Sequence, residues 1–308
     1  MRVLVAGGAG FLGSHLVERL LAEGRSVDVV DDLSTGTLAN LADARSDPGR
    51  QLRFHQLDIR TAELDALVGR REAEVAYHLV ASPAGPDSAL QVALIGGLRL
   101  LEAARRGRIG KVVFVLRASE LYADATAGQL PIRESHLQQP RTVDAVVARA
   151  VLDSLHLYRE RHAVEYTALA VGEVYGPRAA PTGGLVGALC AGLVRGGPCP
   201  VPGDGRQTSD YLYVDDAVDA LARSAGRGSG LVLNVGTGQE TSANAVFGVL
   251  AAAAGLDRRP DPAPADPATP RRFALDAARA KLHLGWEPWT ALVDGAGATV
   301  SWWASRVA

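Results

Sequence analysis

Three glycines near the start of the chain have the spacing of a phosphate-binding loop. Gly7, Gly10 and Gly13 follow an apolar run and precede a helical pattern. In such a turn the first glycine allows the sharp bend, the second lets backbone N–H groups approach a pyrophosphate, and the third allows close packing of helix on strand. The free N–H groups and the dipole of the helix start favour anions. The spacing therefore predicts a dinucleotide-binding site.

Two acidic residues stand where a dinucleotide ribose would need them. Asp31 ends a second apolar run at about 20 residues from the loop, the distance at which a carboxylate accepts hydrogen bonds from the ribose hydroxyls. Asp32 adds a second negative charge, which repels a 2′-phosphate. NAD(H) is therefore the favoured cofactor, and NADP(H) is the alternative if nearby arginines offset that charge.

The elements that must position these residues follow from the alternation of apolar runs and helical patterns. This alternation is typical of a parallel sheet with helices on both faces. The predicted strands are Arg2–Ala6, Val27–Val30, Arg53–Gln56, Val75–Leu79, Lys111–Leu116 and Tyr166–Val171. The predicted helices are Ser14–Ala22, Ala93–Ala104 and Val143–Tyr158. Glycines make Thr182–Gly197 a candidate mobile segment instead of a rigid helix.

The predicted fold class is α/β, a Rossmann doubly wound parallel sheet with a smaller C-terminal substrate-binding cap domain. We expect the NAD-binding Rossmann domain to span 1–172, with 206–235 returning to it. The cap domain is then formed by 173–205 and 236–308.

Composition and charge exclude several classes of protein. The 308 residues are 47% hydrophobic and carry a net charge of −2, which leaves no broad positive field for nucleic acid or a membrane surface. No apolar run reaches the ~18 residues of a membrane span, and no signal peptide is recognisable. The two cysteines, Cys190 and Cys199, lack the spacing of metal ligands, so no metal is expected. We expect a cytoplasmic protein with a small-molecule substrate and no nucleic-acid or membrane partner.

Motifs along almost the whole chain resemble those of the extended short-chain dehydrogenase/reductases, typified by nucleotide-sugar epimerases and dehydratases. The resemblance rests on the glycine loop and on Val29–Gly36, Val174–Arg178, Tyr213–Asp216, Asn234–Gly238 and Leu284–Pro288. It implies that Asp58 contacts the adenine and that the cap holds a substrate above the nicotinamide. Further implied cofactor contacts are Phe11, Leu12, Leu33, Ser34, Ile59, Leu79, Val80 and Ala81. Family members often dimerise through Rossmann helices, so a homodimer through Val143–Tyr158 is expected as an option.

The catalytic positions of that family hold unreactive side chains in this chain. Members use a Ser or Thr at the end of the fifth strand and a Tyr-x-x-x-Lys on the next helix, where the tyrosine exchanges a proton with the substrate. Aligned on Tyr122, these positions are Ala118, Val143 and Val147. Ser119 is a poor substitute, because neighbouring residues of a strand point to opposite faces. The resemblance therefore predicts that the whole triad is absent.

Positions that hold the substrate in the family have changed as well. Glu173 stands where the family has an asparagine, and Ser209 where it has an arginine. An arginine fork binds a diphosphate well, whereas an anionic Glu173 repels it. The substrate-pocket candidates are Glu173, Ser119, Glu120 and Tyr122, of which Tyr122 reads more readily as a packing residue.

Three functions are compatible with this pattern. We favour an atypical NAD(P)H-dependent ketoreductase of antibiotic biosynthesis, resembling the simocyclinone-type angucyclinone ketoreductases. It would reduce a bulky aromatic polyketide ketone, with the proton supplied by the substrate or by water. The second is a nucleotide-sugar epimerase, dehydratase or decarboxylase with replacement residues such as Glu120, Tyr122 or Glu173. The third is a non-catalytic NAD-binding protein.

Overall fold

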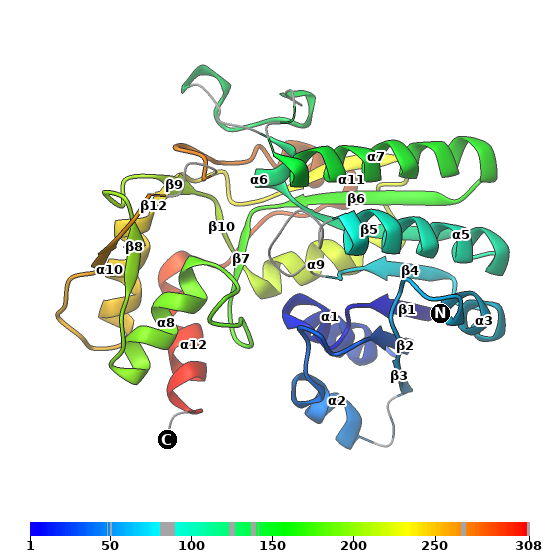
Figure 1. The fold of residues 1–308 in the computed structure, drawn as a ribbon, viewed down its shortest axis with the longest axis horizontal. Coiled ribbons are helices and arrows are strands. Elements are labelled where there is room, and N and C mark those ends of the chain that lie inside the picture. Colours follow the sequence, from blue (N-terminus) through cyan, green and yellow to red (C-terminus); the bar gives the residue numbers. More distant parts are fainter. Residues whose placement is uncertain are drawn as a thin grey trace. The chain divides into compact units, whose positions relative to one another are not determined.

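The contacts of the chain divide it into two compact units, shown in the computed structural model of Figure 1. The structure describes residues 1–47, 49, 51–80, 90–122, 127–136, 140, 142–265 and 269–306. Unit 1 comprises Met1–Leu116, Gln139–Ala170 and Val218–Leu233. Unit 2 comprises Arg117–Gln138, Val171–Ala217 and Asn234–Ala308.

This division differs from the predicted one most in two segments, and by two residues each at 171–172 and 234–235. Residues 117–138 and 206–217, which we placed with the Rossmann domain, belong to unit 2. In the first segment, Ile132 accepts a hydrogen bond from the Asn234 side chain and donates its N–H to Ala274. In the second, Tyr211–Tyr213 pairs with Glu173–Tyr175. Both sets of partners are distant in sequence, which is why local patterns did not reveal them.

Unit 1 is built on a seven-stranded sheet, which confirms the predicted α/β class. The strand order is β11-β6-β5-β4-β1-β2-β3, and the pairings of β1, β2, β3, β4 and β5 are parallel. Its strands are β1 Arg2–Ala6, β2 Ser26–Asp31, β3 Leu52–Gln56, β4 Val75–His78, β5 Lys111–Arg117, β6 Glu165–Val171 and β11 Leu231–Val235. The order reverses between β1 and β4, and ligands bind at such a switch point in open α/β sheets.

Helices cover both faces of this sheet (Figure 1). The helical segments are α1 Phe11–Ala22, η1 Leu38–Leu41, α2 Ala42–Ser46, α3 Glu63–Arg71, η2 Leu90–Gly96, α5 Gly97–Gly107, α7 Val143–His162 and α9 Val214–Ser224. α5 packs against both α3 and α7. On α9, Asp219 pairs with Arg19 of α1, and the Leu221 carbonyl accepts from Tyr77 of β4. The core between these layers is formed by fully buried strand residues such as Leu4, Val5 and Val113.

The helix boundaries correct two local predictions in unit 1. α1 begins at Phe11, three residues before the predicted start, because Gly10 and the following residues already turn into the helix. The predicted helix at Ala93–Ala104 begins as the wide π-helical segment η2 and becomes α-helical only from Gly97. A Cβ on Gly97 would lie 3.1 Å from the Phe114 ring, so this glycine permits α5 to pack close to β5.

Unit 2 consists of short strand pairs and of helices, most of them brief. Its strands are β7 Glu173–Tyr175, β8 Pro200–Pro202, β9 Thr208–Ser209, β10 Tyr211–Tyr213, β12 Thr241–Ser242 and β13 Asp261–Ala263. Its helical segments are α6 Ala118–Leu121, η3 Ala127–Gln129, η4 Glu134–His136, α8 Leu185–Arg195, α10 Ala243–Ala253, α11 Ala278–Leu284 and α12 Leu292–Ala304. The strands pair as β10 with β7, β12 with β9 and β13 with β8.

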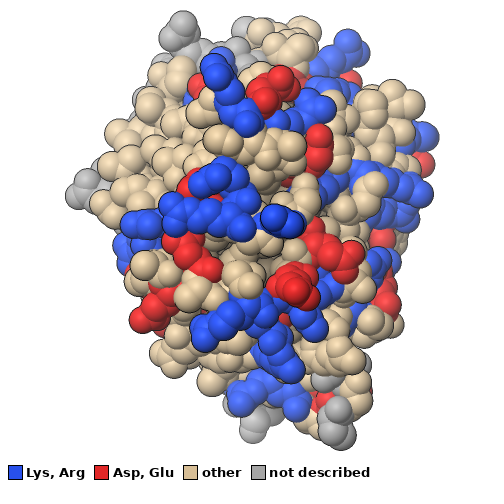
Figure 2. All heavy atoms as spheres, turned by 90° about the vertical axis from the view of Figure 1, so that its right-hand side faces the viewer, with Lys and Arg blue, Asp and Glu red and all other residues tan. Residues whose placement is uncertain are grey.

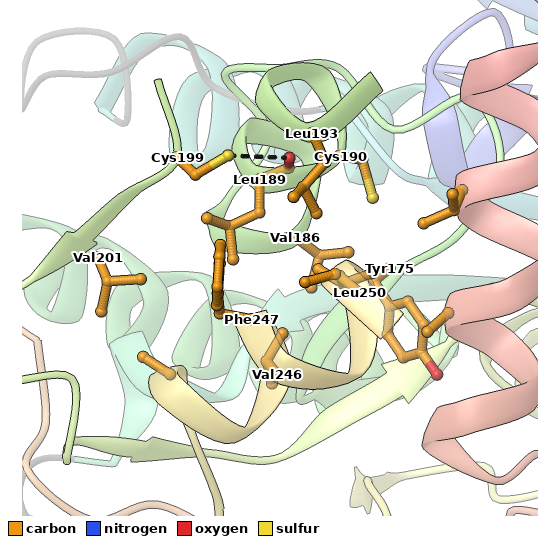
Figure 3. Packing of buried hydrophobic residues seen from close by; sticks show 14 of the residues in the cluster. Tyr175, Val186, Leu189, Cys190, Leu193, Cys199, Val201, Val246, Phe247 and Leu250 are labelled. Atoms are coloured by element: carbon orange, nitrogen blue, oxygen red, sulfur yellow. Dashed lines mark hydrogen bonds between the residues drawn. The ribbon is translucent and has the colours of Figure 1, made fainter. Parts of the chain in front are cut away.

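The core of unit 2 lies where α8, α10 and α12 pack together. Figure 3 shows Val186, Leu189 and Leu193 of α8 facing Phe247 and Leu250 of α10. The Sγ of Cys199 points to the Leu189 carbonyl, at 3.9 Å, and away from Cys190. Both thiols are buried and free.

The expectation that Thr182–Gly197 avoids a rigid helix is wrong, because α8 occupies most of this segment. The glycines of this segment permit close packing and do not make the backbone flexible. A Cβ on Gly187 would lie 2.3 Å from the Ala180 carbonyl oxygen, and one on Gly192 would lie 2.1 Å from that of Pro198. The backbone contacts that demand glycine come from neighbouring loops, which the helix pattern does not display.

Candidate functional site

The glycine loop of unit 1 is held in a conformation that favours glycine. Gly7 has φ +81° and donates its N–H to Val30 on β2, at 2.8 Å. A Cβ on Gly7 would lie 2.7 Å from the Leu79 carbonyl, and a Cβ on Gly13 would lie 2.1 Å from the Gly7 oxygen. The loop is therefore fixed by backbone contacts on both sides.

The start of α1 is arranged to receive an anion. Gly10 is the N-cap residue and makes no side-chain cap. In the first turn that follows, the N–H groups of Phe11 and Leu12 have no intrahelical acceptor. These donors and the helix dipole fit a pyrophosphate at this position, and the missing side chain at Gly10 leaves its approach open. The residues of the loop therefore fit a bound dinucleotide.

Asp31 is fixed at the end of β2 by two backbone hydrogen bonds. Its Oδ2 accepts from the Ala9 N–H and its Oδ1 from the Leu33 N–H, both at 2.9 Å. Burial raises the pKa of this carboxyl, and the two hydrogen bonds oppose that shift. Each oxygen keeps a further lone pair for a ribose hydroxyl. Leu33 adopts φ +63° to make this contact.

The residues after Asp31 form an exposed turn. The Oδ1 of Asp32 accepts from the Ser34 N–H at 2.9 Å and from its hydroxyl at 2.6 Å. Gly36 packs close to the glycine loop, where a Cβ would lie 2.8 Å from the Ala9 carbonyl carbon. This packing was not predicted, although the motif Val29–Gly36 contained the glycine.

The residues implied to contact the cofactor beyond the glycine loop and Asp31 are only partly free for it. Arg60 holds the Asp58 carboxylate through its Nε and a 2.6 Å contact from Nη2, and this pairing lowers the pKa of Asp58. Ile59 is buried against the backbone of Gly96. Leu79 donates to the Ala6 carbonyl at 2.9 Å and is half-buried, as is Val80. Ala81 lies outside the described residues.

The three positions predicted to have lost the catalytic triad differ in exposure. Ala118 begins α6 and is buried; Val147 is also buried, on α7. Val143 begins α7 and is 52% exposed. The side chains at these positions carry no ionisable group or hydroxyl, so they contribute no proton transfer.

Ser119 does not lie on a strand, contrary to the prediction. β5 ends at Arg117, and residues 118–121 form a helical turn, so Ala118 and Ser119 do not alternate across a strand. Ser119 is half-buried, as is Glu120, whose carboxylate lies 3.7 Å from Arg117.

Tyr122 is a packing residue in this structure. Its side chain is 1% exposed, and its hydroxyl donates to Asn234 Oδ1 at 2.7 Å. The Asn234 backbone N–H in turn donates to Glu134 at 2.8 Å. Burial raises the pKa of Tyr122 well above its usual range. A buried phenol with this hydrogen bond connects Tyr122 to Asn234 and, through it, to Glu134.

Glu173 lines a small cavity in unit 2. β7 and β10 place it directly opposite Tyr211, and the turn at Gly183–Gly184 closes the other side. Tyr211 was not among the predicted pocket residues, because its position became evident only from the pairing of two strands distant in sequence. The nearest sequence signal was Ser209, two residues before Tyr211, at a position where the resemblance implies an arginine.

Among the described residues, no group of three or more His, Cys, Asp or Glu side chains could hold a metal ion. Over the same residues, no helix is long and apolar enough to cross a membrane. Figure 2 shows basic and acidic side chains interspersed over one face of the molecule. Ion pairs near the ends of α3 and α5 include Arg105–Glu102 at 2.7 Å and Arg106–Asp65 at 3.7 Å.

A glycine loop at the switch point of a parallel sheet, with an acid at the end of β2, defines a Rossmann-type dinucleotide-binding protein. Residues 3–236 match the model of the NAD dependent epimerase/dehydratase family. The chain is 37% identical over 315 residues to the UDP-glucose 4-epimerase of Mycolicibacterium smegmatis, covering 99% of each protein. The chain therefore belongs to the NAD dependent epimerase/dehydratase family.

Solved structures agree with this placement. The UDP-glucose 4-epimerase of Thermotoga maritima with UDP-glucose is 30% identical, with a TM-score of 0.92 over 100% of both chains. That of Thermus thermophilus, in complex with NAD, is 31% identical with a TM-score of 0.90, covering 98% of this chain and 99% of the other. The extended short-chain dehydrogenase/reductase resemblance and the choice of NAD(H) are confirmed.

The prediction of an angucyclinone-type ketoreductase is contradicted by these similarities, which run through both units to enzymes named for nucleotide sugars. The aromatic ketone substrate and the role in antibiotic biosynthesis have no support. That prediction rested on the unreactive side chains at Ala118, Val143 and Val147 and on the changed positions Glu173 and Ser209, none of which identifies a substrate.

Proposed function

We propose that this protein is an NAD(H)-dependent enzyme that acts on a nucleotide-activated sugar. The observation that carries the proposal is the 37% identity to a UDP-glucose 4-epimerase over 99% of the chain. An intact glycine loop and a fixed Asp31 support it, since both are needed for the cofactor of such a reaction.

The chemistry that NAD(H) would supply when bound is reversible hydride transfer: the oxidised form accepts a hydride from a substrate carbon that bears a hydroxyl group, and the reduced form donates one. The chain's own part in this is to bind and to orient. The first-turn N–H groups of Phe11 and Leu12 would hold the pyrophosphate, and Asp31 would accept from the ribose hydroxyls. Gly7 and Gly13 keep these donors in place, because the loop has no room to shift.

The proton that accompanies the hydride must move through a group other than the family's tyrosine and lysine. Of the three replacements considered, Tyr122 is unsuitable because its buried hydroxyl is committed to Asn234. Glu120 and Glu173 are both half-buried carboxylates and stay candidates. A missing general acid costs about 10²–10⁴-fold in rate, so we expect slow but measurable turnover.

The test is an assay of the purified protein with NAD and a panel of UDP- and dTDP-hexoses, with the products separated by chromatography. We expect one nucleotide sugar to be converted to an epimer, a keto sugar or a decarboxylated sugar. Glu120→Gln and Glu173→Gln then show which carboxylate contributes to the proton transfer. Failure to convert every sugar, with NAD binding intact, would contradict the proposal.

A second candidate is a non-catalytic NAD-binding protein. The specific observation in its favour is that Ala118, Val143 and Val147 all lack a reactive group. Under this alternative the panel gives no product, while Asp31→Asn still weakens NAD binding. The two candidates thus differ in turnover and agree in cofactor binding.

A further inference from the structure

Ala9 lies in the middle of the glycine loop, and its backbone is held from two sides. Its N–H donates to Asp31 Oδ2 at 2.9 Å, which ties the loop to the acid at the end of β2. Its carbonyl accepts from the Thr37 N–H at 3.1 Å and from Nδ2 of the Asn40 side chain at 2.9 Å. The loop is therefore attached both to β2 and to the turn that follows β2.

Asn40 is placed for this contact by the short helical segment η1. Thr37 caps the start of the segment, because its hydroxyl accepts from the Ala39 N–H at 3.3 Å. The Thr37 carbonyl accepts from the backbone N–H of Asn40 at 3.1 Å. Leu41 ends the segment and is fully buried. Both ends of the turn are thus anchored, and Asn40 itself is half-buried.

The peptide group that joins Ala9 to Gly10 is fixed at its oxygen and at its hydrogen. The oxygen has the two donors described above, and the Gly10 N–H donates to the Gly7 carbonyl at 3.2 Å. Gly36 packs against the same peptide group, since an added Cβ would lie 2.9 Å from the Ala9 oxygen and 3.0 Å from the Gly10 nitrogen. This peptide group directly precedes α1, so its orientation determines where the free N–H groups of the first turn point.

We propose that Asn40 is a positioning residue for cofactor binding, whose amide holds the glycine loop and Asp31 in one fixed arrangement. The pyrophosphate and the adenosine ribose of a dinucleotide are covalently joined, so both are bound well only when the loop and the carboxylate keep their spacing. An arrangement that is fixed before binding lowers the entropic cost of binding. Asn40 acts through Ala9 and not on the ligand. The inference rests on the cofactor binding in the proposed function and is independent of the sugar.

The first measurement is the NAD affinity of the full chain, by calorimetric titration. Asn40→Ala removes the amide, and Asn40→Leu removes it while keeping a branched side chain of similar size. We expect either variant to bind NAD about fivefold to tenfold more weakly, which is the effect of one lost hydrogen bond. The matched control is Asn244→Ala, which should leave NAD affinity unchanged. The Asn244 side chain also donates to a backbone carbonyl at 2.9 Å, that of Asp204 in unit 2.

Hydrogen exchange of the nucleotide-free protein separates positioning from direct contact with the ligand. The backbone amides of residues 7–13 should exchange about fivefold faster in both Asn40 variants than in the wild type or in Asn244→Ala. A double variant adds a second check. In the Asp31→Asn background, Asn40→Ala should weaken NAD binding less than about twofold, because both side chains act on Ala9.

Two results would overturn the inference. The first is wild-type NAD affinity in both Asn40 variants. The second is weaker NAD binding with unchanged exchange of the loop, which would place Asn40 in direct contact with the ligand. Asn40→Ala only shortens the side chain, so it keeps the test valid if the leucine disturbs folding. Because neither measurement involves a sugar, failure of the proposed function appears separately, as absent turnover with NAD binding intact.

Discussion

The glycine loop of unit 1 and the Glu173 cavity of unit 2 are built from different parts of the chain. In the loop, backbone atoms form the surroundings, and Gly7 and Gly13 have no space for a Cβ. In the cavity, Glu173 is the one charged side chain among the described residues that line it. A site made of backbone restricts every residue that shapes it, whereas a site made of side chains changes with one substitution. The comparison explains why the cofactor was predicted correctly and the substrate was not.

The largest effect in the loop should come from Gly13→Ala. The added Cβ would lie 2.1 Å from the Gly7 oxygen, so the loop must move. Overpacking of this kind costs on the order of 3 kcal/mol, and we expect NAD affinity to fall at least about 100-fold. Calorimetric titration with NAD measures it.

The matched control for that variant is Gly69→Ala. Gly69 lies within α3, is exposed, and has no atom within 4 Å of an added Cβ. This substitution should leave NAD binding unchanged and stabilise the protein by about 0.4–1 kcal/mol. Equal NAD affinities of the two variants would show that the loop tolerates displacement.

Asp31→Asn should weaken NAD binding by about 10–100-fold, because hydrogen bonds to a charged group contribute more than neutral ones. The amide cannot accept from Ala9, Leu33 and two ribose hydroxyls with the same geometry. Asp32→Asn serves as the neighbouring control. Its carboxylate is exposed and contacts Ser34, so a change of less than about threefold is expected.

Acid should destabilise unit 1 through His78. This side chain is fully buried and stacks on Phe114 at 4.4 Å, and burial lowers its pKa from 6.5 to about 4. Between these values the unfolded chain holds a proton that the folded chain does not. The free energy of unfolding should therefore fall as pH drops from 6.5 to 4, by up to about 3 kcal/mol from this group.

Denaturant titrations at several pH values measure this loss. In His78→Phe the aromatic stack is preserved and the titrating group is gone, so the pH dependence in this window should be smaller. If the two proteins lose stability in parallel, His78 is not the source.

The last variant, Tyr122→Phe, separates packing from catalysis. The variant leaves Asn234 Oδ1 buried without its donor, at a cost of about 1–3 kcal/mol, visible in the melting temperature. Turnover per folded molecule should not change. A variant that keeps its stability and loses activity would make Tyr122 the proton donor after all.

The parts of the fold that could be predicted are those that local residue patterns determine. The six predicted strands appear within one or two residues of their expected ends, because buried β-branched runs and flanking glycines determine them. α8 was not predicted, because its glycines were taken as a sign of flexibility. Gly187 and Gly192 are instead required by close contacts with loop carbonyl groups, and these contacts are evident only in the three-dimensional structure. The same limit applied to segments 117–138 and 206–217, whose partners lie far along the chain.

The candidate site likewise contains residues that could be predicted from the sequence and residues that could not. The loop and Asp31 could be predicted because both the residue types and their spacing follow from the shape of a dinucleotide. Tyr211 could not, since only the pairing of β7 with β10 places it opposite Glu173. The role of Tyr122 depended on Asn234, more than a hundred residues away.

The most direct test of the account is the absorbance of reduced nicotinamide after a nucleotide sugar is added to the NAD-loaded protein. We predict that a sugar from the UDP or dTDP panel gives this absorbance or a new product, and that Asp31→Asn weakens the response. NAD bound as tightly as in an active enzyme, with neither absorbance nor product from any sugar, would contradict it and leave a cofactor-binding protein without turnover.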